Sequence, residues 1–242
     1  MNKDNRAGLV PPMRAVARVS SDFSTKFGIP RQAGLVPELR ARVVFEPEFR
    51  DPEALRGIEG FSHLWLIWVF SASVREGWSP TVRPPRLGGN ERMGVFATRS
   101  PFRPNPIGLS AVRLEGVEND PALGPVLLVR GADLMDGTPI LDIKPYVPYA
   151  DAVPGASEGF AHAPGAALAV VFPPALRARV PETLLPALTG VLAQDPRPRY
   201  QHDPDRVYGF AFAGLEVRFR ADGETLTVCG VEPSGLAPDG AV

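Results

Sequence analysis

Short apolar segments of strand length dominate the first part of the chain. Most are rich in Val, Leu, Ile and Phe and are bounded by Gly, Pro, Asn or Asp, which is typical of β-strands. The predicted strands are residues 14–23, 40–46, 63–70, 94–100, 109–118, 125–134 and 139–147. This succession favours a closed or nearly closed β-barrel of about seven strands, in a fold that is mainly β.

One helix is indicated among these strands, at residues 51–57. Asp51 suits the N-cap, Pro52 the first helical position and Gly57 the exit. Because helices are so few, a doubly wound α/β sheet is disfavoured.

A break in the pattern divides the chain after the last predicted barrel strand. Residues 154–165 are rich in Gly and Pro, which is linker chemistry. Beyond them we predict a strand at 167–172, a helix at 181–194, and a hairpin of strands 208–220 and 225–231 around an Asp-Gly turn. We therefore expect a barrel domain over residues 1–152, a linker over 153–165 and a small α+β domain over 166–242.

The composition narrows the class of protein. A hydrophobic content of 44% can fill a core, and no apolar run reaches the roughly 18 residues of a membrane span. No signal-peptide pattern opens the chain, so we expect a cytoplasmic protein without membrane attachment. The lone Cys229 excludes an internal disulfide, and three scattered histidines predict no metal site.

The net charge of −1 hides an uneven distribution. Residues 1–110 hold 16 Lys and Arg against 10 Asp and Glu, whereas residues 111–242 hold 10 against 17. Residues 83–110 alone contain five Arg, five Pro and four Gly against the single acid Glu91. With 23 Arg and 3 Lys in the chain, one arginine can simply solvate the surface. Five in one loop indicate an anion-binding site.

Several familiar chemistries are absent from the sequence. There is no G-x-x-x-x-G-K-[ST], no G-x-G-x-x-G after a strand and no G-x-S-x-G, which disfavours the common nucleotide cradles and a nucleophile elbow. Three polar segments remain as candidates. They are a rigid turn displaying Arg31 and Gln32, the arginine loop, and a stretch in which an Asp136-Gly-Thr turn precedes Asp142, Lys144 and Tyr146 on one strand face. The last also fits a plain turn and ion pair.

These same segments resemble the TrmO (YaeB, TsaA-like) family over essentially the whole chain. The matching motifs are FGIPRQ at 27–32, FSHLW at 61–65, RPPRLGGN at 83–90, GVFATRSPFRPNPIGLS at 94–110, DGTP at 136–139, DIKPY at 142–146 and DPRPRY at 195–200. Family members often have Phe-His where this chain has Phe70-Ser71, so any contact of that imidazole is made differently here.

The resemblance implies a homodimeric, S-adenosylmethionine-dependent tRNA methyltransferase with a β-barrel core. The implied substrate is N6-threonylcarbamoyladenosine (t6A) in the anticodon loop of tRNA, methylated on N6 to N6-methyl-t6A. By analogy, the cofactor site comprises Pro30, Arg31, Gln32, Ser71, Ala72, Arg99, Ser100, Leu109, Ser110, Met135, Asp136, Gly137 and Thr138. On chemical grounds, Asp136 suits the sulfonium, and Arg31 or Arg99 suits the cofactor carboxylate.

The substrate explains the arginines, because t6A carries a threonyl carboxylate beside the loop phosphates and Arg pairs bidentately with both. We expect Arg103 or Arg86 to read that carboxylate. The expected tRNA contacts are Arg83, Arg86, Arg92, Arg103, Arg197, Arg199 and Tyr200. Segment 195–200 should then approach the arginine loop in one subunit or across a dimer.

The general base cannot be assigned from the sequence. Its candidates are Asp136, Asp142, Lys144 and Tyr146. Two other functions stay open. The first is a barrel that binds S-adenosylmethionine or tRNA without chemistry, and the second, more weakly supported, is an enzyme for another acyl or carbamoyl substrate.

Overall fold

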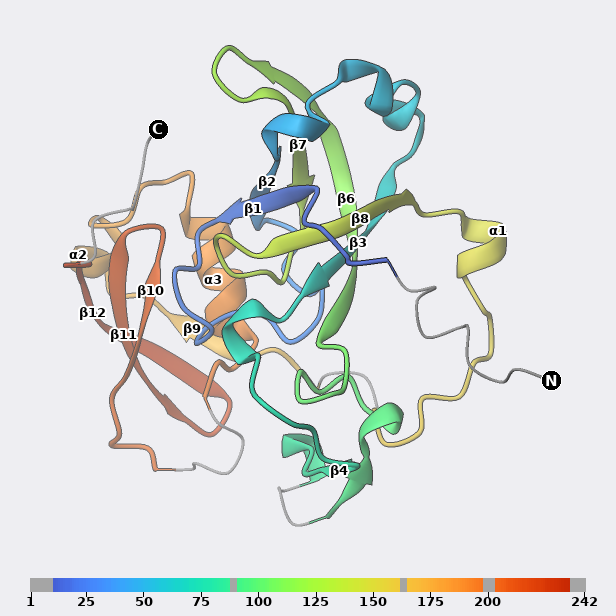
Figure 1. The fold of residues 1–242 in the computed structure, drawn as a ribbon. Coiled ribbons are helices and arrows are strands. Elements are labelled where there is room, and N and C mark those ends of the chain that lie inside the picture. Colours follow the sequence, from blue (N-terminus) through green and yellow to red (C-terminus); the bar gives the residue numbers. More distant parts are fainter. Residues whose placement is uncertain (1–10, 88–90, 162–164, 198–202, 236–242) are drawn as a thin grey trace.

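Six antiparallel strands close a barrel in the order β1-β2-β7-β6-β3-β8 (Figure 1). The computed structural model describes residues 11–87, 91–161, 165–197 and 203–235. The barrel strands are β1 Ala17–Ser21, β2 Arg40–Phe45, β3 His63–Val69, β6 Ile107–Asp120, β7 Gly124–Arg130 and β8 Pro139–Pro145. The mainly β barrel is confirmed, with six strands instead of about seven.

The predicted strand 94–100 is wrong. Only Met93–Gly94 (β5) is extended there, and it pairs with Thr81–Val82 (β4) outside the barrel. A 3₁₀ turn, Val95–Ala97, follows. Strand-like alternation fails because Val95 is buried whereas the next two residues, Phe96 and Ala97, are both exposed in the turn, Phe96 to 73%.

The predicted helix 51–57 forms only the 3₁₀ turn Pro52–Leu55. Its cap is confirmed, since the Asp51 carboxylate accepts a 3.0 Å hydrogen bond from the Glu53 backbone N–H. The short helix Pro148–Asp151 (α1) follows the barrel.

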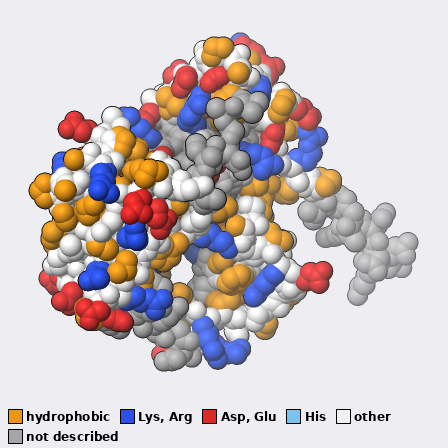
Figure 2. All heavy atoms as spheres, turned by 90° about the vertical axis from the view of Figure 1, so that its left-hand side faces the viewer, with side chains coloured by type: hydrophobic (Ala, Val, Ile, Leu, Met, Phe, Trp, Pro, Cys, Tyr) orange, Lys and Arg blue, Asp and Glu red, His pale blue; other side chains and the backbone are white. Residues whose placement is uncertain are grey.

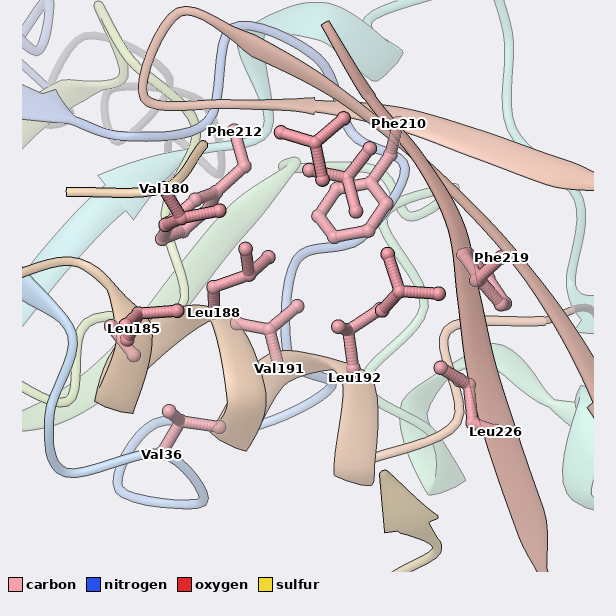
Figure 3. Packing of buried hydrophobic residues seen from close by; sticks show 14 of the residues in the cluster. Val36, Val180, Leu185, Leu188, Val191, Leu192, Phe210, Phe212, Phe219 and Leu226 are labelled. Atoms are coloured by element: carbon pink, nitrogen blue, oxygen red, sulfur yellow. The ribbon is translucent and has the colours of Figure 1, made fainter. Parts of the chain in front are cut away.

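The C-terminal part is a four-stranded sheet in the order β10-β11-β12-β9 with a helix packed on it (Figure 3). Its elements are β9 Ala169–Val171, α2 Pro174–Arg177, α3 Leu185–Ala193, β10 Tyr208–Phe212, β11 Leu215–Asp222 and β12 Thr225–Pro233. The expected single strand 208–220 is divided, because Ala213 and Gly214 turn the chain with positive φ. None of the described helices has the length and apolar character needed to cross a membrane.

Residues 22–39, between β1 and β2, belong to the C-terminal core and not to the barrel core. Val19 and Ala41 pack inside the barrel, whereas Phe23, Val36 and Leu39 are 1–2% exposed within the C-terminal cluster. Figure 3 shows Val36 beside α3. Burial of each such side chain stabilises the fold by about 1.5–3 kcal/mol. The chain therefore passes from one core to the other and back within a single connection.

Gly28 lets this connection lie against the C-terminal sheet. Its φ is +94°, and a Cβ at this position would lie 2.4 Å from Cδ2 of Phe210. Phe210 is itself 3% exposed and packs against Phe27 with ring centroids 6.4 Å apart. Only glycine supplies both the backbone conformation and the space.

Gly28→Ala should destabilise the protein by about 3 kcal/mol, because it adds overpacking against Phe210 to the backbone strain of positive φ. Gly34→Ala is the matched control. Gly34 has φ +79° with no atom within 4 Å of its added Cβ, so only strain of about 1 kcal/mol is expected. Urea unfolding measures both variants, and equal losses would contradict the packing argument.

Candidate functional site

A cavity of about 480 Å³ lies where β3 ends and β6 begins. Its lining residues come from four segments far apart in sequence, within residues 26–32, 68–73, 99–109 and 133–138. The first of these belongs to the connection held in the C-terminal core. The volume is that of a small-molecule site, and the cavity is predominantly apolar with a few converging polar groups.

Nine of the thirteen residues expected to bind a cofactor line this cavity. They are Pro30, Arg31, Gln32, Ser71, Ala72, Arg99, Leu109, Met135 and Thr138. Of the other four, Ser100 lines a neighbouring groove and Ser110 is 2% exposed beneath the wall. Ser71, which stands where the family often has histidine, is exposed at the cavity wall. The binding roles of all thirteen stay predictions.

The Asp136-Gly-Thr turn comes directly before β8, is hydrogen-bonded to β1 and presents Thr138 to the cavity. The Asp136 carboxylate accepts a 2.9 Å hydrogen bond from the Ser21 backbone N–H, and the Gly137 N–H donates to the Val19 carbonyl at 2.8 Å. Neither Asp136 nor Gly137 is a lining residue. In this structure the Asp136 side chain therefore anchors the turn to the end of β1.

A hydrogen-bonded chain of three side chains forms part of the cavity wall. Trp68 Nε1–H donates to Ser110 Oγ at 3.0 Å, and Ser110 Oγ–H donates to Asp133 Oδ1 at 2.6 Å. The Trp68 indole lies over Gly108, where a Cβ would come within 2.3 Å of the ring. The absence of a side chain at Gly108 thus leaves space for the Trp68 indole. The indole N–H orients the Ser110 hydroxyl, which in turn orients the Asp133 carboxyl group.

Asp133 is the only acid among the described residues that line the cavity. Burial raises the pKa of Asp133, and this outweighs the lowering by the Ser110 hydrogen bond and by the charge of Arg99. Sequence reasoning missed Asp133. The only local signal for a functional role of Asp133 is its position in Gly131-Ala-Asp, shortly before the Asp136-Gly-Thr turn.

The cations of the cavity are held by local hydrogen bonds. The Arg99 guanidinium donates to Gln32 Oε1, and Arg103 Nη1 donates to the Thr98 carbonyl at 3.1 Å. Lys26 Nζ bonds the Ala72 carbonyl and Ser73 Oγ, the latter at 3.1 Å. One partly buried carboxyl group therefore lies in the same cavity as a set of positioned basic groups.

A wider groove of about 1390 Å³ adjoins the cavity and shares four of its lining residues, which are Arg31, Gln32, Arg99 and Pro101. Arg83, Arg92 and Arg197, three of the expected tRNA contacts, line this groove. Figure 2 shows a hollow in the lower half of its face, with Lys and Arg side chains around it. Segment 195–200 thus approaches the arginine loop within one chain, as its described part shows.

The guanidinium of Arg197 points into the protein. It is 8% exposed, donates to Asp195 at 2.8 and 3.0 Å and donates to the Ala221 carbonyl at 3.0 Å. These bonds stabilise the turn in which Asp195 has φ +50°. Arg199, Tyr200 and the side chain of Arg86 lie outside the described part of the chain, so the predictions for them stay open.

Asp142, Lys144 and Tyr146 lie away from the cavity. Asp142 and Lys144 form a 2.8 Å ion pair, which raises the pKa of Lys144. The Tyr146 ring packs against Trp65 with centroids 5.4 Å apart. Lys144 pairs with Trp65 in the sheet, whereas the cavity begins three residues later at Trp68. The contacts of Asp142 and Lys144 fit the alternative given in the sequence analysis, in which they form an ion pair with a structural role.

Comparison with known proteins matches both parts of the chain. The tRNA-methyltransferase O N-terminal domain matches residues 18–152, and the TrmO C-terminal domain matches residues 166–234. The tRNA (adenine(37)-N6)-methyltransferase of Escherichia coli (strain K12) is 43% identical over 227 residues, which cover 89% of this chain and 95% of that protein.

Two further comparisons agree with these matches. A relative from Pseudomonas aeruginosa (strain PAO1) carries the words S-adenosylmethionine-dependent methyltransferase in its name and is 45% identical, covering 84% of this chain and 90% of its own. The crystal structure of TrmO from Pseudomonas aeruginosa superposes with a TM-score of 0.73 at 36% identity, covering 92% and 99% of the two chains. The chain therefore belongs to the tRNA-methyltransferase O family.

Proposed function

We propose that this protein transfers a methyl group from S-adenosylmethionine to N6 of t6A beside the tRNA anticodon. The observation that carries the proposal is the junction of the cavity, which combines one partly buried carboxyl with positioned cations, and the arginine-lined groove. The name of the Escherichia coli relative supports methylation of adenine N6 in tRNA. A binding module without chemistry would need neither the partly buried carboxyl nor its hydrogen-bonded support.

The cavity fits S-adenosylmethionine in size and in chemistry. Trp68, Phe70 and Leu109 offer apolar surface to the adenine, and Arg31 or Arg99 suits the amino-acid carboxylate. When bound, the cofactor supplies a methyl group activated by its sulfonium.

Arg103 is the residue that we assign to the threonyl carboxylate of t6A. Among the expected tRNA contacts whose side chains the structure describes, Arg103 is the one that lines the cavity itself, whereas Arg83 and Arg92 line the groove and suit phosphates. Unpaired anticodon-loop bases enter a protein pocket at little unstacking cost. The target base would therefore reach the cavity while its backbone stays in the groove.

We assign proton transfer to Asp133. The N6 lone pair of t6A is delocalised into the ureido group, so methylation is favoured when the N6 proton leaves. Methyl transfer to N6 would release the N6 proton, and the Asp133 carboxylate would accept it. Its raised pKa makes this carboxylate a stronger base, and Ser110 fixes its orientation.

We also propose a homodimer. At the cavity rim, β3 and β6 carry Ile107, 38% exposed, and Leu109, 51% exposed, paired with Val69 and Ile67. Ile107, Leu109 and Val69 also line the cavity, so a second copy packed here would complete the cavity wall. An apolar strip of this kind suits a second copy of the chain. Sedimentation should give about twice the chain mass of 26.0 kDa, and Ile67→Glu should shift the protein toward monomer. A monomeric wild type at micromolar concentration would refute this assembly.

The methyl-transfer proposal predicts that label from the cofactor enters tRNA carrying t6A and not tRNA lacking it. Arg103→Ala should weaken binding of t6A-containing tRNA by roughly 10- to 100-fold and leave unmodified tRNA nearly unaffected, because a charged hydrogen-bonding partner is lost.

Arg113→Ala is the matched control, since Arg113 is exposed on β6 opposite His63, away from the cavity. Equal losses for both tRNAs would overturn the carboxylate assignment of Arg103. Absence of label in any tRNA would overturn the proposed function.

Asp133→Asn should lower kcat by roughly 10²- to 10⁴-fold while changing cofactor affinity little. It should also stabilise the protein at pH 7. Because burial raises the folded pKa above the ordinary 3.8, the carboxyl imposes no cost at low pH, where both folded and unfolded states are protonated. The protein with Asp133 loses stability as the pH rises through the folded pKa of this carboxyl. The Asp133→Asn variant does not, because asparagine does not ionise.

Methyl-transfer kinetics and urea unfolding at pH 4 and 7 measure the two effects of Asp133→Asn. A variant that retains kcat but binds cofactor poorly would show that Asp133 only holds the cofactor. A stability difference independent of pH would contradict ionisation of the partly buried Asp133 carboxyl at pH 7.

A further inference from the structure

Three large aromatic side chains are exposed around the groove. Phe96 is 73% exposed, Trp78 53% and Phe102 40%. The Trp78 and Phe96 rings lie 6.3 Å apart at 35°. Phe96 and Phe102 line the groove, and Trp78 shares with Phe102 a smaller adjoining hollow of about 260 Å³. Such a cluster of exposed rings on one segment requires a physical explanation.

The backbone holds Phe96 outward. Its neighbour Val95 is 1% exposed and fixes the turn, with its N–H donating to the Pro80 carbonyl at 2.9 Å. The Thr98 N–H and hydroxyl both donate to the Val95 carbonyl, at 3.2 and 2.9 Å. The ring is therefore presented by an ordered turn whose one buried residue points the other way.

The surroundings of these rings are strongly basic. The described lining of the groove contains six arginines and one acid, Glu158. Arg75 stacks its guanidinium over the Phe102 ring at 4.2 Å from the centroid. Stacked arginines and exposed aromatics along a cationic groove are the features by which proteins hold single-stranded nucleic acid.

We propose that Phe96, with Trp78 and Phe102 beside it, is a stacking platform for unpaired RNA bases that neighbour the base to be methylated. The inference rests on the proposed function and names a subsite of it. Because Arg31 and Arg99 border both the groove and the cavity, bases stacked on the platform leave an adjacent nucleotide at the cavity mouth. The near absence of acids favours a polyanion over a protein partner.

Binding of an unmodified anticodon stem–loop RNA, without cofactor, tests the platform. Phe96→Ala should weaken binding about tenfold, and Trp78→Phe should remove fluorescence quenching by the RNA. The slope of log affinity against log salt should stay unchanged in Phe96→Ala and fall by roughly one in Arg83→Ala, which removes a phosphate contact. Tyr149→Ala is the control, because Tyr149 is 92% exposed on α1.

An affinity of Phe96→Ala within twofold of wild type would overturn the platform. So would a loss of dimer in sedimentation with RNA affinity retained, since the rings would then serve a protein interface. The two proposals fail separately. Wild-type protein that binds RNA through Phe96 but transfers no methyl group refutes the proposed function alone, whereas active Phe96→Ala with unchanged RNA affinity refutes only the platform.

Discussion

The cavity depends on a connection whose apolar side chains are buried in another part of the molecule. Between Val19 and Ala41 the chain leaves the barrel core, places Phe23, Val36 and Leu39 in the C-terminal core and returns. Pro30, Arg31 and Gln32 stand in the middle of that excursion and form one wall of the cavity. The barrel supplies the other walls, from the ends of β3, β6 and β8. Packing of the C-terminal sheet therefore determines the shape of a site that is otherwise built from the barrel.

Asp133, in the cavity wall, shows how a protein accommodates a costly group. A carboxyl group removed from water is unfavourable unless hydrogen bonds or charges compensate for the lost hydration. Ser110 and Arg99 compensate Asp133 only in part, because its pKa remains raised. Trp68 fills the space over Gly108 and keeps the hydroxyl of Ser110 directed. Local destabilisation of this kind is typical of functional sites, where stability is lost so that a group keeps its reactivity.

Sequence patterns identified most strands because each alternates between a packed and a solvated face. Leu64, Leu66 and Trp68 in β3 follow this rule throughout. The rule fails at 94–100, because these residues form a turn in which Val95 is buried and Phe96 is exposed to solvent. Asp133 was missed for a different reason. Its hydrogen-bond partner Ser110 lies on a strand 23 residues earlier in the chain. No local sequence spacing therefore identifies Asp133 as a functional residue. Nine of the thirteen cofactor residues that the family resemblance implies line the cavity, but only the structure separates them from Asp136, which is hydrogen-bonded to the backbone of β1.

Arg31 and Arg99 border two hollows at once, and this has a thermodynamic consequence. A ligand in the cavity that attracts either guanidinium changes the field that a polyanion in the groove meets. If one ligand changes the affinity of the other by some factor, the second ligand changes the affinity of the first by the same factor, because coupling free energies are reciprocal. The shared wall thus makes the order of ligand arrival a matter of concentrations, while the stability of the ternary complex is the same by either route.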